Sequence, residues 1–330
     1  MLQLISNSKR YEKNARKEKK MPEITLDELT LKMKEPESLV ELDEKIYIEK
    51  ISQVAARVAD NKSIRVILLA GPSASGKTTT ANLIADRIRE LGERCAVVSL
   101  DNFYKDACDP TYPRLFDGER DLESPYALDL DLLIATLGDI ISGKEFSVPK
   151  YDFKVGGKVG AEKYPSFAEG CVIIEGIHGL NPIISDPFPK DSVLKVFVSV
   201  STNINHNGRR ILSGRKLRFV RRLVRDNLYR ASDAKRTLDM WDNVLRGEDK
   251  YLYPYKELAD IRFDTFHTFE PGVMKRYAMK LLTPTVTAES TYAAAVASAM
   301  EKMPELDESL VPETSLIREF IPGGIYEHLY

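Results

Sequence analysis

The sequence predicts an α/β fold in which helices cover both faces of a doubly wound parallel sheet. Three observations lead to this fold class. Short apolar runs alternate with helical patterns, a glycine-rich loop joins the first run to a helix, and 330 residues suffice for one large core with a small appendage. The apolar runs span residues 64–70, 95–100, 171–174, 193–200 and 260–264, and the helical patterns span 44–60, 78–91 and 129–142.

Composition places the chain among ordinary soluble globular proteins. It is 43% apolar and 30% charged, and its net charge of −2 offers no global attraction to nucleic acid or to an anionic membrane. No apolar run approaches the roughly 20 residues that span a bilayer. Three cysteines without Cys-x-x-Cys spacing and four scattered histidines indicate a reducing compartment and no zinc site. We therefore expect a cytoplasmic protein without a membrane partner.

Residues 1–43 are predicted to be an amino-terminal extension that is partly disordered or helical. Within it, residues 6–20 are rich in lysine and arginine, which suits either a solvated, frayed helix or a nucleic-acid-binding arm, and the solvated helix is the favoured interpretation. From residue 44 to 60 apolar residues recur at helical spacing, so a helix leads into the first strand. Residues 44–285 are expected to form the main domain.

A Gly-Pro-Ser-Ala-Ser-Gly-Lys-Thr segment, residues 71–78, lies between the first apolar strand and an amphipathic helix. This context is typical of a phosphate-binding loop and disfavours a simple glycine turn. Gly71 and Gly76 permit backbone conformations that direct amide N–H groups at a β-phosphate. Lys77 can reach the β/γ oxygens, and the Thr78 hydroxyl can bind magnesium. The predicted ATP-binding residues are Gly71, Ser73, Ala74, Ser75, Gly76, Lys77, Thr78 and Thr79.

Two acidic residues follow predicted strands. Asp101 comes directly after strand 95–100, which is expected to lie beside the phosphate-loop strand. Its carboxylate then faces the γ-phosphate, deprotonates an attacking hydroxyl group and shares in holding magnesium; the alternative is a turn or helix-capping aspartate. Glu175 follows the run 171–174 and precedes a glycine. A magnesium-side carboxylate is favoured there over a strand-end glutamate that faces water.

Two long interruptions, residues 103–128 and 146–169, break the alternation of strands and helices. Both are rich in Pro, Gly and Tyr and are predicted to be loops. Interruptions of this length in a compact domain usually form lids or substrate walls.

A basic segment, residues 209–236, contains eleven Lys or Arg residues and only two acids. Four of them share one helix face: Arg218, Arg221, Arg222 and Arg225. They repel one another unless anions lie among them. The anion is either the triphosphate, with residues of about 206–258 acting as a lid, or a nucleic-acid backbone; a solvated face is the third alternative. Few base-stacking aromatics accompany the stripe, which favours the lid and disfavours nucleic acid.

The chain after the last strand is predicted to be helical near 271–282 and 288–303 and to end in an apolar tail with Pro and Gly. Residues 286–330 are therefore expected to form a helical tail packed on the main domain. Trp241 has apolar neighbours and is predicted to pack in the core and not to stack on a ligand.

Five short segments form a set with a specific order and spacing: Gly71–Thr78, Asp101–Tyr104, Tyr151–Phe153, Ile173–Gly176 and Arg221–Asp226. Four more stand at 121–124 (Asp-Leu-Glu-Ser), 175–182 (Glu-Gly-Ile-His-Gly-Leu-Asn-Pro), 237–241 (Thr-Leu-x-Met-Trp) and 318–321 (Arg-Glu-Phe-Ile). Together they resemble the uridine kinase and phosphoribulokinase family, in particular a bacterial uridine-kinase-like branch. The likeness spans about residues 45–324.

This resemblance implies a P-loop NTPase type of sheet with a helical lid and roles for individual residues. Asp101 is then the general base on a nucleoside 5′-hydroxyl group, Lys77 a catalytic cation and Tyr104 a wall of the nucleoside pocket. Glu175, Thr78 and Asp101 are the implied magnesium-side residues. The remaining implied residues are Tyr151, Glu123 and Arg221 at the substrate and the catalytic lid arginines Arg222 and Arg225.

Two departures from the family pattern concern the acceptor. Glu123 stands where uridine–cytidine kinases carry a ribose-binding aspartate, and Gly156 and Gly157 follow Tyr-Asp-Phe where those kinases carry a base-reading histidine. Longer members of the branch also have leading domains that resemble part of threonyl-tRNA synthetase. The chain has no room for them, so the function that they add is expected to be absent.

The leading hypothesis is an ATP- and magnesium-dependent kinase that phosphorylates a nucleoside 5′-hydroxyl group. The alternatives are a kinase for another small alcohol, such as pantothenate or a sugar phosphate, and a nucleotide-gated RNA-binding protein. A GTPase switch is disfavoured because no Asn-Lys-x-Asp motif occurs. The expected partner is a small molecule, and the number of subunits, a homo-oligomer included, stays open.

Overall fold

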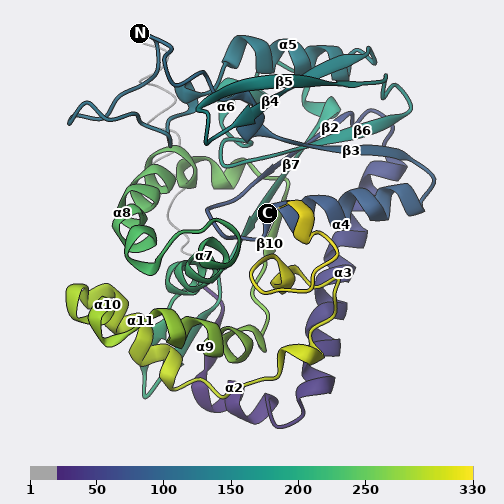
Figure 1. Ribbon diagram of the computed structural model, residues 1–330. Helices are drawn as coiled ribbons and strands as arrows, with labels where there is room; N and C mark the ends of the chain where they lie inside the picture. Colours follow the sequence, from purple (N-terminus) through teal and green to yellow (C-terminus); the bar gives the residue numbers. More distant parts are fainter. Residues whose placement is uncertain (1–20, 330) are drawn as a thin grey trace, which may run out of the picture.

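The computed structural model describes residues 21–329, and at its centre is a five-stranded parallel sheet (Figure 1). The strand order is β10-β7-β2-β6-β3. The strands are β2 (Val66–Ala70), β3 (Arg94–Ser99), β6 (Gly170–Glu175), β7 (Val193–Ser199) and β10 (Ile261–Asp264). Each predicted apolar run is therefore a strand of one sheet. The basic segment 6–20 lies outside the described residues.

The place of β3 in the sheet differs from the prediction. This strand does not lie beside β2, because β6 separates the two and β3 forms the edge of the sheet. Strands that are consecutive in sequence need not be neighbours in a parallel sheet, since each crossover passes over a face of the sheet and can skip a position. Because the three strands are parallel, the carboxyl ends of β2, β6 and β3 still lie along the same side of the sheet, which we call its carboxyl edge.

Helices cover both faces of this sheet and make up most of the lid (Figure 1). The tail predicted to be helical is so only up to Glu301, and residues 302–329 are largely irregular with three short 3-10 turns. In chain order they are α2 (Leu26–Lys32), α3 (Pro36–Asp60), α4 (Lys77–Glu90), α5 (Leu130–Ile141), α6 (Pro182–Ser185), α7 (Gly214–Tyr229), α8 (Ala234–Tyr251), α9 (Glu270–Leu281), α10 (Pro284–Glu289) and α11 (Thr291–Glu301). The helix predicted near 288–303 begins at Thr291, because the Ser290 side chain caps it there.

Alternate residues of β2 face different helices, and this makes the sheet doubly wound. Ile67 and Leu69 belong to a core shared with α3, α4, α7 and α9. Val66 and Leu68 belong to a second core shared with α5 and the segment around residue 103. A strand that is covered on both faces must be apolar at every position, and all residues of β2 are buried.

The interruption at 146–169, predicted to be a loop, is instead a hairpin. Strands β4 (Phe146–Asp152) and β5 (Gly157–Tyr164) pair antiparallel and form a sheet of their own. The turn needs Gly156, which has a φ of 71° and leaves only 3.1 Å between a hypothetical Cβ and that of Ala107. No residue of β5 is fully buried, so the apolar alternation that identifies a strand is absent. The interruption at 103–128 is largely irregular, as predicted.

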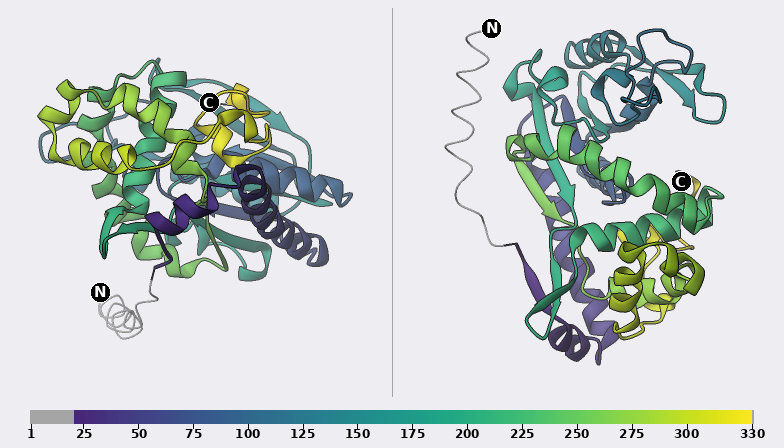
Figure 2. Two further views of the ribbon diagram at one scale, coloured as in Figure 1. Left: turned by 90° about the horizontal axis from the view of Figure 1, so that it is seen from below. Right: turned by 90° about the vertical axis from the view of Figure 1, so that its left-hand side faces the viewer.

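The lid segment, residues 206–258, consists mainly of β9 and the helices α7 and α8. Strand β9 (Arg209–Leu212) pairs with β8 (Asn203–His206), which in turn pairs with the amino-terminal β1 (Glu23–Thr25). Helices α7 and α8 lie between the part of the molecule with the β4–β5 hairpin and the part with α9, α10 and α11 (Figures 1 and 2). Trp241 of α8 is buried against Phe219 of α7, which confirms its predicted packing role.

The tail runs back along the main domain. Figure 1 shows it in yellow beside α3 and α4, and buried tail residues join the core of those helices: Leu316, Ile317, Phe320 and Ile321. Helix α3 is continuous from Pro36, so the domain boundary predicted at residue 44 falls inside a helix. Within residues 21–329 no helix combines the length and the apolar character needed to cross a membrane.

Candidate active site

Side-chain donors hold the carbonyl groups of the phosphate loop between β2 and α4. Ser73 O accepts a hydrogen bond from Arg218 (2.8 Å), and Ser75 O accepts one from the Thr265 hydroxyl group (2.8 Å). A peptide unit carries its N–H group opposite its carbonyl group. Fixing the carbonyl groups toward the surrounding protein therefore turns the loop amides toward the centre of the loop.

Two residues with positive φ bend the loop into an anion-binding shape. They are Ala74 (φ 55°) and Gly76 (φ 87°), and within residues 21–329 their amides donate to no protein acceptor. Helix α4 begins at the next residue, Lys77. Loop amides and the positive end of a helix dipole together favour a phosphate group. A Cβ at Gly71 would lie 2.3 Å from Val198 O, so only glycine fits there.

The charge of Lys77 acts on carboxyl groups from three separate segments. Asp101, Glu175 and Glu123 each interact with its charge. Lys77 Nζ itself donates to Pro72 O at 3.1 Å. Glu175 closes β6 and Asp101 follows β3, so the parallel strands deliver both acids to the edge where the phosphate loop begins.

Asp101 combines partial desolvation with nearby positive charge. Its side chain is accessible to solvent, but the protein atoms packed around it desolvate the carboxyl group and raise its pKa. The charges of Lys77, Arg230 and Arg225 act in the opposite direction and stabilise the carboxylate. A carboxylate whose pKa is raised accepts a proton more readily, which suits a general base.

Glu175 and Thr78 offer oxygen atoms of the kind that Mg²⁺ prefers. Burial raises the pKa of Glu175 to about 7, and this residue is paired in register with Leu69 and Ser99 on the neighbouring strands. Thr78 lies in the first turn of α4. The described part of the chain has no cluster of three His, Cys, Asp or Glu side chains that suits a metal. The residues therefore fit an ion that takes one or two carboxylates and completes its shell with phosphate oxygens and water.

Aromatic rings line the side of the site next to Asp101. The Tyr104 ring lies 5.8 Å from that of Tyr151 and 5.5 Å from that of Phe153, and the last two rings are 5.0 Å apart. Tyr104 is fixed by a hydrogen bond from its hydroxyl group to Leu122 O (2.8 Å). The β4–β5 hairpin thus supplies two of the three rings of this wall.

Glu123 ties the acceptor side of the site to the lid. It packs closely against α8, because a Cβ atom added at Gly247 would lie only 2.4 Å from the Cβ atom of Glu123. Burial raises the pKa of Glu123 to about 7, while the charge of Arg222 acts against this rise. Asp121 accepts hydrogen bonds from the Tyr251 hydroxyl group (3.0 Å) and from the Glu123 amide (3.2 Å). Two acids therefore border both the aromatic wall and the lid helix.

The two predicted catalytic arginines of α7 act on the phosphate loop and on Asp101. Arg222 Nη1 donates to Ser73 Oγ at 2.8 Å. The charges of Arg225 and of Arg230, which follows the end of α7, both act on Asp101. The Arg230 side chain is 53% exposed, so it can move toward a ligand. The lid therefore brings the Arg222 guanidinium group to the phosphate loop and the charges of Arg225 and Arg230 to Asp101.

The protein itself neutralises two arginines of the stripe, whereas the argument from the sequence required ligand anions among all four. Arg222 and Arg225 share a single carboxylate, that of Asp226. Arg218 pairs with Glu248 and Arg221 pairs with Glu270, and all four side chains are fully buried. Arg221, which the resemblance places at the substrate, instead lies in the core and donates to Glu270 (2.7 Å) and Thr265 O (2.8 Å). The helix face is stabilised by protein carboxylates that lie far from it in the sequence.

Sequence reasoning missed three residues at this site, namely Arg230, Glu248 and Glu319. Glu248 accepts a hydrogen bond from the Ser73 amide (2.8 Å), and Glu319 accepts from the amide (3.2 Å) and hydroxyl (3.0 Å) of Thr79. No local pattern could identify Glu248, which lies far from the loop in sequence. Glu319 stands in the Arg-Glu-Phe-Ile segment 318–321 that contributes to the resemblance, but no role was assigned to it. Arg230 did carry a signal, since it closely follows the arginine stripe.

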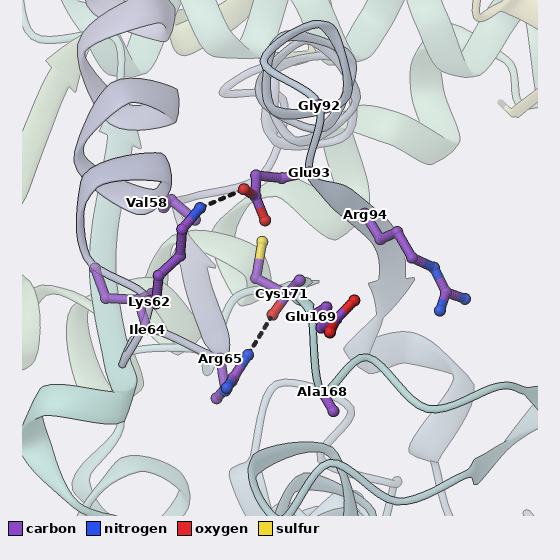
Figure 3. Close-up of a pocket in the computed structure, with 11 residues that line it drawn as sticks. Val58, Lys62, Ile64, Arg65, Gly92, Glu93, Arg94, Ala168, Glu169 and Cys171 are labelled. Atoms are coloured by element: carbon purple, nitrogen blue, oxygen red, sulfur yellow. Dashed lines mark hydrogen bonds and ion pairs between the residues drawn. The ribbon is translucent and has the colours of Figure 1, made fainter.

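A cavity of about 560 Å³ lies at the opposite edge of the sheet, where the strands begin (Figure 3). Arg65, Arg94 and Gly170, at the starts of three strands, line it. Some of its polar groups pair with one another, since Lys62 pairs with Glu93 and Arg65 donates to Gly170 O (3.4 Å). None of the predicted site residues lines this cavity. It is therefore separate from the candidate active site.

Comparison with known proteins identifies relatives of this chain. The sequence profile of the Phosphoribulokinase / Uridine kinase family matches residues 66–270, which include the central sheet, the phosphate loop, both strand-end acids and the lid helices. Uridine kinases of Staphylococcus aureus strains JH9 and Newman are 30% identical to the chain over 204 residues. The aligned region covers 61% of this chain and 87% of each relative.

Two solved structures share a partial likeness with the chain. One is a possible uridine kinase from Bacillus stearothermophilus, with a TM-score of 0.45 and 18% identity over 66% of this chain and 98% of that chain. The other is D-glycerate 3-kinase from Cryptococcus neoformans var. grubii, with a TM-score of 0.33 and 16% identity over 76% of this chain and 87% of that chain.

Proposed function

Because the chain belongs to the phosphoribulokinase / uridine kinase family, we propose that it transfers the γ-phosphoryl group of ATP to the 5′-hydroxyl group of a nucleoside. Membership of the family makes it a P-loop kinase, and the nucleoside acceptor is the proposal. The observation that supports this acceptor best is Asp101 beside Lys77 at one end of an aromatic wall. A base, a phosphate-binding cation and flat apolar surfaces gather at one edge of the sheet.

In this proposal the loop amides hold the β-phosphate, and Lys77 binds the β and γ oxygens. Bound magnesium, near Thr78, Glu175 and Asp101, supplies charge neutralisation at the phosphate oxygens. Phosphoryl transfer requires little covalent chemistry from the protein, so catalysis consists mainly of positioning and of electrostatic stabilisation.

Asp101 orients the acceptor hydroxyl group and takes its proton as the new O–P bond forms and the bond between the γ-phosphorus and the bridging oxygen of ADP breaks. The proton stays on the carboxyl group and ADP leaves. Arg222, Arg225 and Arg230 stabilise the charge on the transferring phosphoryl group. In this reaction class a single arginine contributes roughly 10³–10⁵ in rate. Helix α7 carries two of these arginines, so its position determines whether the site is complete.

The acceptor side suits a nucleoside because a flat base can pack on the rings of Tyr104, Tyr151 and Phe153. The carboxyl groups of Glu123 and Asp121 can accept hydrogen bonds from ribose hydroxyl groups. The tight turn at residue 156 places glycine where uridine–cytidine kinases carry a base-reading histidine. The proposal therefore covers nucleosides as a class and not uridine alone.

A kinase for another small alcohol, such as pantothenate or a sugar phosphate, is the second candidate, and the missing base-reading side chain favours it.

The nucleotide-gated RNA-binding alternative has lost its main support. Two arginines of its basic stripe, Arg218 and Arg221, are paired with buried glutamates and are not open to a nucleic-acid backbone.

The test is an acceptor panel. The purified protein is incubated with magnesium–ATP and, in separate reactions, with each common ribonucleoside and deoxyribonucleoside, pantothenate and several sugar phosphates, and ADP release is followed. We expect a nucleoside to drive ADP release and a 5′-monophosphate to appear by mass spectrometry. Release with pantothenate or a sugar phosphate alone would move the acceptor to the second candidate. Absence of magnesium–ATP binding by calorimetry would overturn the kinase mechanism itself.

A further inference from the structure

All three polar groups of Ser73 are held by the lid. Its amide donates to Glu248 Oε1 (2.8 Å), its carbonyl oxygen accepts from Arg218 Nη1 (2.8 Å), and its hydroxyl oxygen accepts from Arg222 Nη1 (2.8 Å). Arg218 and Arg222 belong to α7 and Glu248 belongs to α8. The third residue of the phosphate loop is therefore bound, main chain and side chain alike, by two helices that are distant in sequence.

The two main-chain contacts come from a rigid ion pair. Arg218 and Glu248 form two parallel hydrogen bonds of 2.7 Å, and both side chains are fully buried. Arg218 also donates to the Tyr253 hydroxyl group (3.3 Å), and its guanidinium group lies 5.6 Å from the centre of the Trp241 ring. A bidentate pair enclosed in this way holds its geometry closely, so it sets the position of whatever else it binds.

We propose that Arg218 and Glu248 are positioning residues that hold the phosphate loop in its phosphoryl-transfer geometry through Ser73. The inference rests on the proposed function, in which this loop binds ATP for transfer to an acceptor. Arg222, which is expected to act on the γ-phosphoryl group, binds the hydroxyl group of the same serine. Ser73 therefore fixes the position of the phosphate loop relative to the lid arginine Arg222.

The same turn of α8 also contacts the acceptor side. Gly247 directly precedes Glu248, and the Glu123 side chain packs against Gly247. A displacement of this turn would shift the phosphate loop and the acceptor segment together. A buried ion pair adds little net stability compared with apolar residues of similar volume, whereas phosphoryl transfer is sensitive to small displacements of the bound phosphate. The main contribution of the Arg218–Glu248 ion pair is therefore to fix the geometry of the site and not to stabilise the fold.

The test compares two double variants. R218L/E248L removes both buried charges together, so no unpaired charge remains in the core. The control, R215Q/D249N, removes an ion pair that joins the same two helices at the protein surface. Each variant is assayed for kcat, for the KM values of ATP and of the acceptor found in the panel, for magnesium–ATP affinity by calorimetry, and for the midpoint of thermal unfolding.

We expect R218L/E248L to lower kcat by about tenfold to a hundredfold and to weaken magnesium–ATP binding, while the unfolding midpoint stays near the wild-type value. R215Q/D249N should match the wild type in every measurement. A folded R218L/E248L protein with wild-type kcat and wild-type ATP affinity would overturn the proposal. So would an equal loss of activity in both double variants.

A second variant covers the case in which R218L/E248L does not fold. E248D retains both charges and shortens the side chain by one methylene group, which withdraws the acceptor from the Ser73 amide. It should lower kcat at an unchanged unfolding midpoint, and full kcat in E248D would also overturn the proposal. If the panel selects an alcohol that is not a nucleoside, the nucleoside proposal fails. The comparison of R218L/E248L and E248D with the control R215Q/D249N, assayed with that alcohol, still decides the role of Arg218 and Glu248.

Discussion

Glu319 of the carboxyl-terminal tail accepts hydrogen bonds from the amide (3.2 Å) and the hydroxyl group (3.0 Å) of Thr79. Thr79 lies in the first turn of α4, where helix N–H groups attract anions. From the same tail, Leu316 packs on Gly76 of the loop. Both tail residues lie beyond residue 270, where the family match ends. An acidic side chain of the chain itself thus holds Thr79, one of the predicted ATP-binding residues.

Glu319→Gln should therefore bind magnesium–ATP more tightly than the wild type. A neutral amide can still accept from Thr79 but no longer repels the triphosphate, and we expect a gain of about fivefold to tenfold, the scale of one partly screened like-charge interaction. Calorimetry measures the affinity. Glu308→Gln, in the same tail but hydrogen-bonded to Tyr277, is the matched control. Weaker binding in Glu319→Gln would show that the carboxylate supports the helix instead of competing with phosphate.

Asp101→Asn should abolish most of the turnover and leave ATP affinity nearly intact. An amide of the same shape cannot take the proton of the acceptor hydroxyl group, and loss of a general base costs about 10²–10⁴ in rate. Single-turnover kinetics and calorimetric ATP binding separate the two effects. If turnover and ATP affinity fall equally, Asp101 has a structural role at the nucleotide.

The free energy of unfolding should depend on pH through Glu175. Burial raises its pKa from 4.5 to about 7, so between these values the folded protein retains a proton that the unfolded chain has lost. Stability through this group is therefore greatest at low pH and falls as the pH rises from 4.5 to 7, by at most about 1.4 kcal/mol per pH unit.

Glu175→Gln should remove that part of the slope in urea unfolding measured from pH 4.5 to 7.5, and it should also weaken the dependence of turnover on magnesium concentration. Glu145→Gln, at an exposed position, serves as the control. Identical pH slopes in Glu175→Gln and the wild type would contradict the raised pKa.

Arg230→Ala should lower kcat by about tenfold or more, because the charge near Asp101 and the transferring phosphoryl group is lost. Stability should change little, since the side chain is half exposed. Arg246→Ala, an exposed arginine of α8, is the control. Steady-state kinetics at saturating ATP provide the readout, and full activity of Arg230→Ala would remove this residue from the site.

Glu270→Gln should destabilise the fold by about 3–5 kcal/mol, because it leaves the buried Arg221 guanidinium group without its counter-charge. Urea denaturation measures the loss. The double variant R221M/E270L should recover much of it, since both charges leave the core together. If the free energy of unfolding of Glu270→Gln lies within about 1 kcal/mol of the wild-type value, water or another acceptor replaces the carboxylate.

Much of the candidate site could be predicted because it is built from local units. The strand, the loop 71–78 and the following helix are consecutive in the chain, and Asp101 and Glu175 each stand directly after a strand. Parallel strands bring such residues to one edge even though the order of the strands differed from the prediction. The β4–β5 hairpin was missed because no residue of β5 is fully buried, which removes the periodic signal.

By itself the sequence determined that the chain forms a doubly wound sheet with a phosphate loop and two acids at its carboxyl edge. Only the tertiary structure decided which charges belong to the site and which to the core. Arg222 reaches the loop while its neighbour Arg221 is paired with Glu270, and Glu248 and Glu319 come to the loop from distant helices and turns. The shape of a loop depends on the conformations of consecutive residues, whereas the partner of a charge depends on distances between residues that lie far apart in the chain.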